Sequence, residues 1–86
     1  MKRSDLVALR RRVICIPLRP TLPDRNTIYQ LTGADIQMGD SALVLETGVG
    51  SAAYDLEEIV DWVKVFIPAG VGWVERSNLE VINEAR

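Results

Sequence analysis

The chain has 86 residues, of which 48% are hydrophobic and 26% are charged, and its formal net charge is −2. This length allows one domain with one core, and the composition is that of a globular protein and not of a disordered one. Because no apolar run approaches the roughly 20 residues that cross a bilayer and the N-terminus lacks the long apolar centre of a secretory signal, we expect a cytoplasmic protein that does not contact a membrane.

Positive charge is concentrated at the N-terminal end. Residues 1–12 contain a single acid, Asp5, and five basic residues, which are Lys2, Arg3, Arg10, Arg11 and Arg12. Ser4 is a suitable helix N-cap before "DLVALRRR", so we expect residues 1–12 to form a short N-terminal helix or a basic arm. Clustered Lys and Arg bind phosphates, so contact of these five residues with nucleic acid is one functional hypothesis. The alternative is a solvated helix end, or an arm folded onto the acidic body of the protein.

Five short strands are predicted in the rest of the chain. The first is "RVICIPL", which ends where Pro17 and Pro20 lack the amide hydrogens that a ladder requires. A long loop follows, with a brief strand in "TIYQLTGADIQMGD". The other strands are rich in β-branched and aliphatic residues and cover residues 41–47, 60–67, 71–75 and 79–82. We therefore expect a mainly β domain over residues 13–86, built as a small barrel or sandwich.

A glycine pattern follows the strand predicted at 41–47. Gly48, Gly50 and Ala53 spell G-x-G-x-x-A, and apolar residues behind them recur at helical spacing. In such a motif the glycines let the backbone approach a phosphate at a helix N-terminus. The opening "VLETGVGS" also resembles the first motif of methyltransferases that bind S-adenosylmethionine. Only about 20 residues follow Phe66, too few for the further βα units of such a sheet, so a nucleotide-binding fragment is kept as a minor alternative.

Two tryptophans lie in the hairpin predicted at 60–75. Its strands are joined by "IPAG", in which proline and glycine favour a turn. Alternation places Val63, Val65 and Val74 on the core side of the hairpin. The other side then carries Trp62, Lys64, Phe66 and Trp73, which we call the aromatic face, with a cation among its rings. Three explanations of this face are open: the N-terminal segment or the long first loop covers it, a second copy or a partner protein binds it, or a peptide, sugar or base stacks on it.

Three segments in the C-terminal half point to one family. They are "MGDSALVLE", "DWVKV" and "GVGWVERSNLEVI". They resemble, in this order, the strand after the long first loop of the Src-homology-3 (SH3) barrel, the segment in which a tryptophan opens its third strand, and its closing strand, short 3₁₀ turn and last strand. The resemblance covers residues 39–82 and is strongest to bacterial members.

The resemblance implies a five-stranded, highly twisted SH3-like barrel that acts as a non-catalytic binding module. Eukaryotic members bind proline-rich peptides in an aromatic-lined groove, and Trp62 falls at the position of the groove tryptophan. Glu75 lies near the place of the groove proline and Leu79 at that of a groove tyrosine. We therefore do not expect proline-rich ligands.

The residues that most enzymes and metal sites use are scarce. The chain has no histidine and one cysteine, Cys15, which excludes Ser-His-Asp and Cys-His arrangements, zinc sites built from Cys and His, and an intrachain disulfide. Cys15 lies in the apolar run "VICI", where we expect a buried small hydrophobe. The acidic run from Asp55 to Asp61 is typical of a solvated loop. We predict no catalysis, no cofactor and no metal.

The leading hypothesis is thus a small interaction module of bacterial or phage type. It acts through the aromatic face on a protein partner or on a second copy of itself, as a homo-oligomer. Nucleic-acid binding through the basic N-terminal residues is the second hypothesis.

Overall fold

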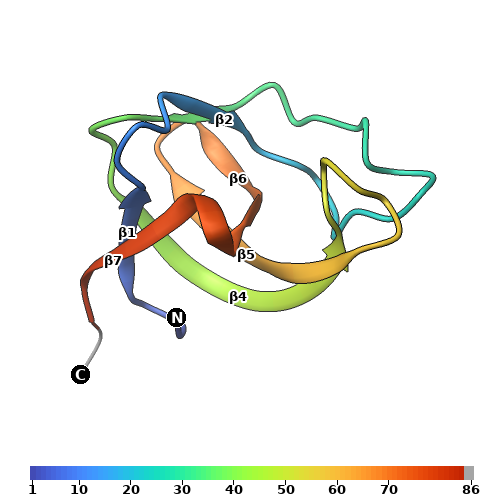
Figure 1. Ribbon diagram of the computed structural model, residues 1–86. Helices are drawn as coiled ribbons and strands as arrows, with labels where there is room; N and C mark the ends of the chain where they lie inside the picture. Colours follow the sequence, from blue (N-terminus) through green and yellow to red (C-terminus); the bar gives the residue numbers. More distant parts are fainter. Residues whose placement is uncertain (85–86) are drawn as a thin grey trace.

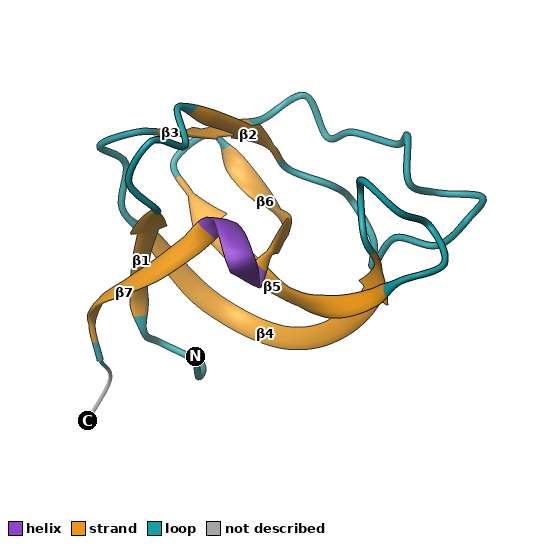
Figure 2. Cartoon of the chain, in the orientation of Figure 1, coloured by secondary structure: helices purple, strands orange, loops and turns teal. Residues whose placement is uncertain are grey.

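The computed structural model describes residues 1–84, which are mainly β (Figures 1 and 2), and the last two residues of the expected domain 13–86 lie outside this range. The expectation of a mainly β chain is confirmed. The elements are β1 (Leu6–Leu9), β2 (Cys15–Pro17), β3 (Asp35–Gln37), β4 (Ala42–Ser51), β5 (Ile59–Ile67), β6 (Gly70–Glu75), the 3₁₀ helix η1 (Arg76–Asn78) and β7 (Leu79–Asn83).

Five strands form one antiparallel sheet in the order β6-β5-β4-β1-β7, and β2 pairs with β3 in a separate ribbon. Figure 1 shows β4 curving along one side of the molecule while β2 lies on the opposite side. A single bridge links the two parts, because Arg19 and Trp73 exchange backbone hydrogen bonds of 3.1 and 2.8 Å. Within residues 1–84 the ladder therefore does not run continuously around a closed barrel.

The predicted N-terminal helix is wrong, because residues 6–9 form β1. Val7 and Leu9 point into the core from this strand, and β4 and β7 pair with it on its two sides. Ser4 does not cap a helix; its φ is 74°, in the left-handed region, and its N–H donates to the carbonyl of Val44 at 2.8 Å. A helix of this length is marginal in water by itself, whereas the strand pairs on both sides and buries both aliphatic residues, so the strand is the more stable conformation. The basic segment is consequently part of the sheet and not a detached arm.

The hairpin of β5 and β6 turns the predicted side toward the core. Val63 lies opposite Val74 and Val65 opposite Gly72, and the turn consists of Pro68 and Ala69. The valines are fully buried in the main core, as alternation predicts. This core is made of Val7, Leu9, Leu18, Ile36, Ala42, Val44, Val63, Val65, Ile67, Val74 and Leu79.

The strand β4 is longer than predicted and contains both Gly48 and Gly50. Residues 52–58 then form a loop without a helix, and β5 begins at Ile59. The strand–turn–helix context that lets a G-x-G-x-x-A sequence cradle a phosphate is thus missing around these glycines.

Close packing of the long loop between β2 and β3 explains three of the glycines. A Cβ at Gly48 would lie 2.8 Å from a terminal carbon of Leu22, and one at Gly50 would lie 2.8 Å from the carbonyl oxygen of Pro23. A Cβ at Gly72 would lie 2.6 Å from the Cβ of Leu18. These glycines let residues 18–23 pack directly on the backbones of β4 and β6.

We expect Gly72→Ala to lower the free energy of unfolding by about 1–3 kcal/mol, because the new Cβ would meet the Cβ of Leu18 and the backbone of Arg19, which cannot move independently of the chain. Gly48→Ala is the matched control, since its Cβ meets only the end of the Leu22 side chain, which can rotate away. Urea unfolding measures both. Equal losses for the two variants would contradict the close approach of the loop to β6.

Candidate functional site

The predicted aromatic face is divided between the interior and the surface. Trp62 and Trp73 are only 2% and 6% exposed, whereas Phe66 is 50% exposed and Lys64 is half-buried. The prediction that the two tryptophans are exposed is therefore wrong. The predicted separation of the tryptophans from the valines is correct, because the tryptophans form a second cluster with Ile28, apart from the valine core.

The long loop between β2 and β3 covers the tryptophans, which is one of the three explanations left open by the sequence. Ile28 is buried against them, and Leu22 packs on the same cluster. Leu56, in the loop before β5, and Val60, at the start of β5, also pack against the cluster. The cover follows from the hydrophobic effect, because two indoles expose more apolar area than a small domain can leave in water.

A compact turn places Ile28 in this cluster. Asp24 accepts hydrogen bonds from the backbone N–H of Asn26 at 2.8 Å and of Thr27 at 3.0 Å, and its own carbonyl accepts the N–H of Ile28 at 3.0 Å. The N–H of Asn26 is the main cause that lowers the pKa of Asp24, since it stabilises the carboxylate form. An exposed ion pair of 3.3 Å between Arg25 and Glu57 joins this turn to the loop before β5.

The cation over the aromatic cluster comes from the long loop. The guanidinium carbon of Arg19 lies 5.9 Å from the centroid of the Trp62 ring, within the range of a cation–π contact. Lys64, the cation expected there from the sequence, lies opposite Trp73 on one side and Glu46 on the other in the ladder. Arg19 was missed because 43 residues separate it from Trp62 and only the fold of the loop brings them together.

We expect Ile28→Ala to lower the free energy of unfolding by about 2–5 kcal/mol and to make tryptophan fluorescence more sensitive to iodide, because it opens the cover of the indoles. Tyr29→Ala changes the next residue, which is 82% exposed while Ile28 is 2% exposed, and should alter the free energy of unfolding by no more than about 0.5 kcal/mol. Similar quenching in Ile28→Ala, Tyr29→Ala and the parent would contradict the covered cluster.

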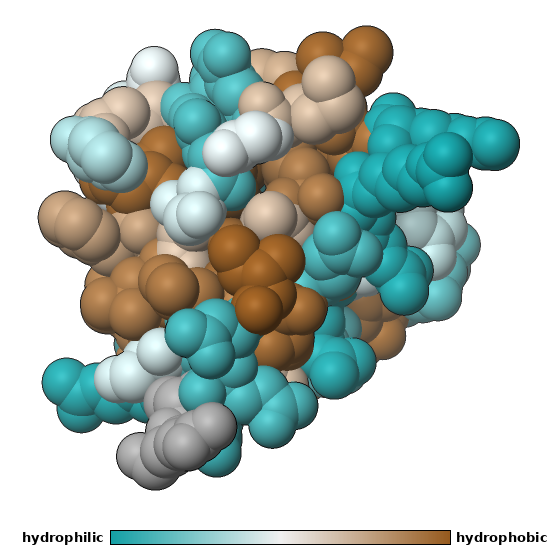
Figure 3. Space-filling model, turned by 90° about the vertical axis from the view of Figure 1, so that its left-hand side faces the viewer, coloured by the Kyte–Doolittle hydropathy of each residue, from teal (hydrophilic) through white to brown (hydrophobic). Residues whose placement is uncertain are grey.

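The exposed part of the aromatic face continues across the outside of the sheet. Phe66 lies opposite Val71 on β6 and opposite Leu43 on β4, and Leu43 lies opposite Leu6 on β1. We call these four residues the outer apolar face. Their chain neighbours Val7, Val44 and Val65 are fully buried, so alternation turns the four away from the core. Figure 3 shows hydrophobic atoms gathered on the side of the molecule that carries β1 and the start of β4.

No protein-family model, curated protein or solved structure matches this chain. What the chain does is therefore inferred from its own residues and their geometry.

The basic N-terminal residues are exposed but do not form one patch along an arm. Lys2 and Arg3 precede β1, while Arg10, Arg11 and Arg12 follow it, so a strand of about 13 Å separates the two groups. The second group is held at the start of β7, where the backbone N–H of Arg10 donates to the carbonyl of Asn78 at 2.8 Å. Binding of nucleic acid through these residues stays a prediction.

If the basic residues bind nucleic acid, the affinity for an oligonucleotide should fall steeply with salt, and the double substitution Arg11→Gln, Arg12→Gln should reduce the slope of log affinity against log salt by about 2. Fluorescence anisotropy with a labelled oligonucleotide measures this slope. Substitution is preferable to deletion of residues 1–12, which would also remove β1 from the sheet. An unchanged slope would reject a role for this group.

Cys15 is exposed and not buried as expected, because its ribbon packs on the core with the neighbouring Ile16 instead. Partial desolvation, and then the carboxylate of Asp35, raise the pKa of the thiol, which lowers its thiolate fraction. In residues 1–84, no group of three or more acidic or Cys side chains is placed to hold a metal ion. The same part of the chain contains no helix that is long and apolar enough to cross a membrane.

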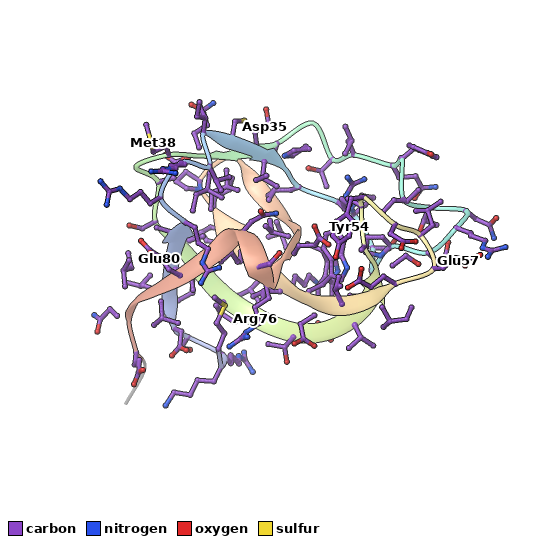
Figure 4. The ribbon with its side chains drawn as sticks, in the orientation of Figure 1. Asp35, Met38, Tyr54, Glu57, Arg76 and Glu80 are labelled. Atoms are coloured by element: carbon purple, nitrogen blue, oxygen red, sulfur yellow. The ribbon has the colours of Figure 1, made fainter. Side chains whose placement is uncertain are left out.

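A hollow of about 660 Å³ lies on the side of the tryptophan cluster, between η1, β7, the start of β5 and the loop before it. Figure 4 shows three of its lining side chains, Tyr54, Arg76 and Glu80, on different sides of η1. Glu75 also lines it; this residue is 7% exposed, and its Oε1 is buried without a hydrogen-bond partner. The indole nitrogen of Trp62, its ladder partner, is buried and unpaired in the same way.

Glu75 is a residue that the sequence did not identify as a site. The available signal was its place in the run "GWVE", where an acid follows two large apolar residues at the end of a strand. Buried carboxylates normally have a hydrogen-bond partner, so an acid that follows core residues in a strand indicates a possible binding site for such a partner.

Proposed function

We propose that this chain is a small non-catalytic interaction module of bacterial or phage type with an SH3-like arrangement, which acts in the cytoplasm without a cofactor. The five-stranded antiparallel sheet, the long loop before β4 and the 3₁₀ turn between β6 and β7 support the SH3-like part of the proposal. The bridge between Arg19 and Trp73 supports a barrel-like curvature, because it draws the segment after β2 to the edge of β6. The lack of histidine supports the absence of catalysis.

The binding surface is the outer apolar face, and the exposure of Phe66 is the observation that carries the proposal. Phe66 is half-exposed and has two apolar ladder neighbours, so its removal from water by a partner is favourable by about 25 cal/mol for each Å² of apolar surface buried. Protein interfaces are enriched in such aromatic side chains at their centres. The partner that fits this surface is a protein.

A second copy of the chain is the first partner to test. Two pairs along the ladder from Phe66 and Leu43, Lys64 and Glu46 lie opposite each other at the edge of the apolar residues. In a two-fold symmetric pair the same patch faces itself, so two neighbouring charges of opposite sign can each meet their counterpart on the other copy. Such a rim of charge around an apolar centre is the usual anatomy of an interface.

We expect the chain to associate with itself as its concentration rises, and Phe66→Ser to weaken this association at least about tenfold, equivalent to about 1.4 kcal/mol. The control is Ile59→Ser, which removes an exposed aliphatic residue at the opposite end of the same strand. Sedimentation equilibrium over a dilution series measures the association of the three proteins. A constant monomer mass for the parent would contradict self-association, and equal association of both variants would place the interface elsewhere.

A further inference from the structure

The buried carboxylate of Glu75 lacks the partner that its position requires. Its side chain is more than nine-tenths buried, and its Oε1 accepts no hydrogen bond. Burial removes the water that would otherwise solvate a carboxylate, and a charged group in such a place is normally paired. Glu75 lines the hollow beside η1, so a cation that enters this space comes next to the carboxylate with the unpaired oxygen.

The hollow carries an excess of negative charge around Glu75. Four carboxylates line it, from Glu58, Asp61, Glu75 and Glu80, against three cationic residues, which are Arg10, Arg76 and Met1 with its N-terminal ammonium. Within residues 1–84 neither arginine forms an ion pair with any of these acids. Arg10 instead donates to the carbonyl oxygen of Ser77 at 3.4 Å. The protein's own cations thus leave Glu75 unpaired.

We propose that this hollow binds a basic side chain of a partner protein, with Glu75 as the carboxylate that pairs with its cation. An arginine side chain fits the site better than a lysine, because its planar guanidinium offers five donors that can reach carboxylates on several walls. Acids on different elements surround the space, with Glu58 on the loop before β5, Glu75 at the end of β6 and Glu80 on β7. The volume of about 660 Å³ is within the range of sites that hold small organic groups.

This site lies apart from the outer apolar face, so it does not depend on self-association through Phe66. None of the four residues of that face lines the hollow. The variant Phe66→Ser therefore leaves the basic-group site intact, and failure of one proposal is distinguishable from failure of the other.

The test is an NMR titration of the full chain with three capped tripeptides, acetyl-Gly-Xaa-Gly-amide, in which Xaa is arginine, lysine or citrulline. Citrulline has the shape of arginine but no charge. We expect saturable shifts of the Trp62 indole and of the amides of residues 75–80 with arginine, weaker binding with lysine and none with citrulline. Putrescine tests a free amine as the ligand; tighter binding of putrescine than of the arginine peptide would overturn the assignment to a protein side chain.

Two substitutions locate the site. Glu75→Gln keeps the size of the side chain and should weaken arginine binding at least tenfold, whereas Glu84→Gln, which removes the same charge from an exposed residue outside the hollow and outside the outer apolar face, should leave it unchanged. Equal binding by parent and Glu75→Gln, or absence of saturable shifts in the parent, would overturn the proposal. If Glu75→Gln does not fold, the comparison of arginine with citrulline on the parent decides, because equal shifts by the two would also overturn it.

Discussion

The structure depends on the packing of one long loop against the sheet. Leu18 lies in the valine core, Arg19 pairs with the edge of β6, and Ile28 lies on the two indoles. The loop can come this close only because residue 72 has no side chain where it passes. The close contact between this loop and β6 therefore joins the two clusters into one folded unit, although the sheets are linked by a single bridge.

This packing also decides which parts of the aromatic hairpin stay exposed. The end of β5 that bears Trp62 is covered, so its indole contributes to stability and not to a free surface. The other end, with Phe66, lies beyond the reach of the loop and stays in water. One strand thus supplies core residues on one side and, on the other side, a covered half and an exposed half, because a twisted sheet does not present a uniform face along its length.

The two surfaces singled out above differ in chemistry. The outer apolar face is a row of aliphatic and aromatic side chains across four strands, which favours burial against another protein. The hollow beside η1 has four acids among its twelve lining residues, one of them the buried Glu75, which favours a cation. A module that joins partners can use both, since apolar contact supplies most of the affinity while charge supplies orientation and selectivity.

The sequence by itself determined those elements whose pattern is local. Alternation was enough to place Val63, Val65 and Val74 on the core side of the hairpin, because successive side chains of a strand point to opposite faces of the sheet. Tertiary structure decided the rest. Residues 6–9 became a strand because β4 and β7 pair with it, and the tryptophans became buried because a distant loop covers them. In each case the deciding contact joins residues far apart in the chain, and local preferences carry no information about such contacts.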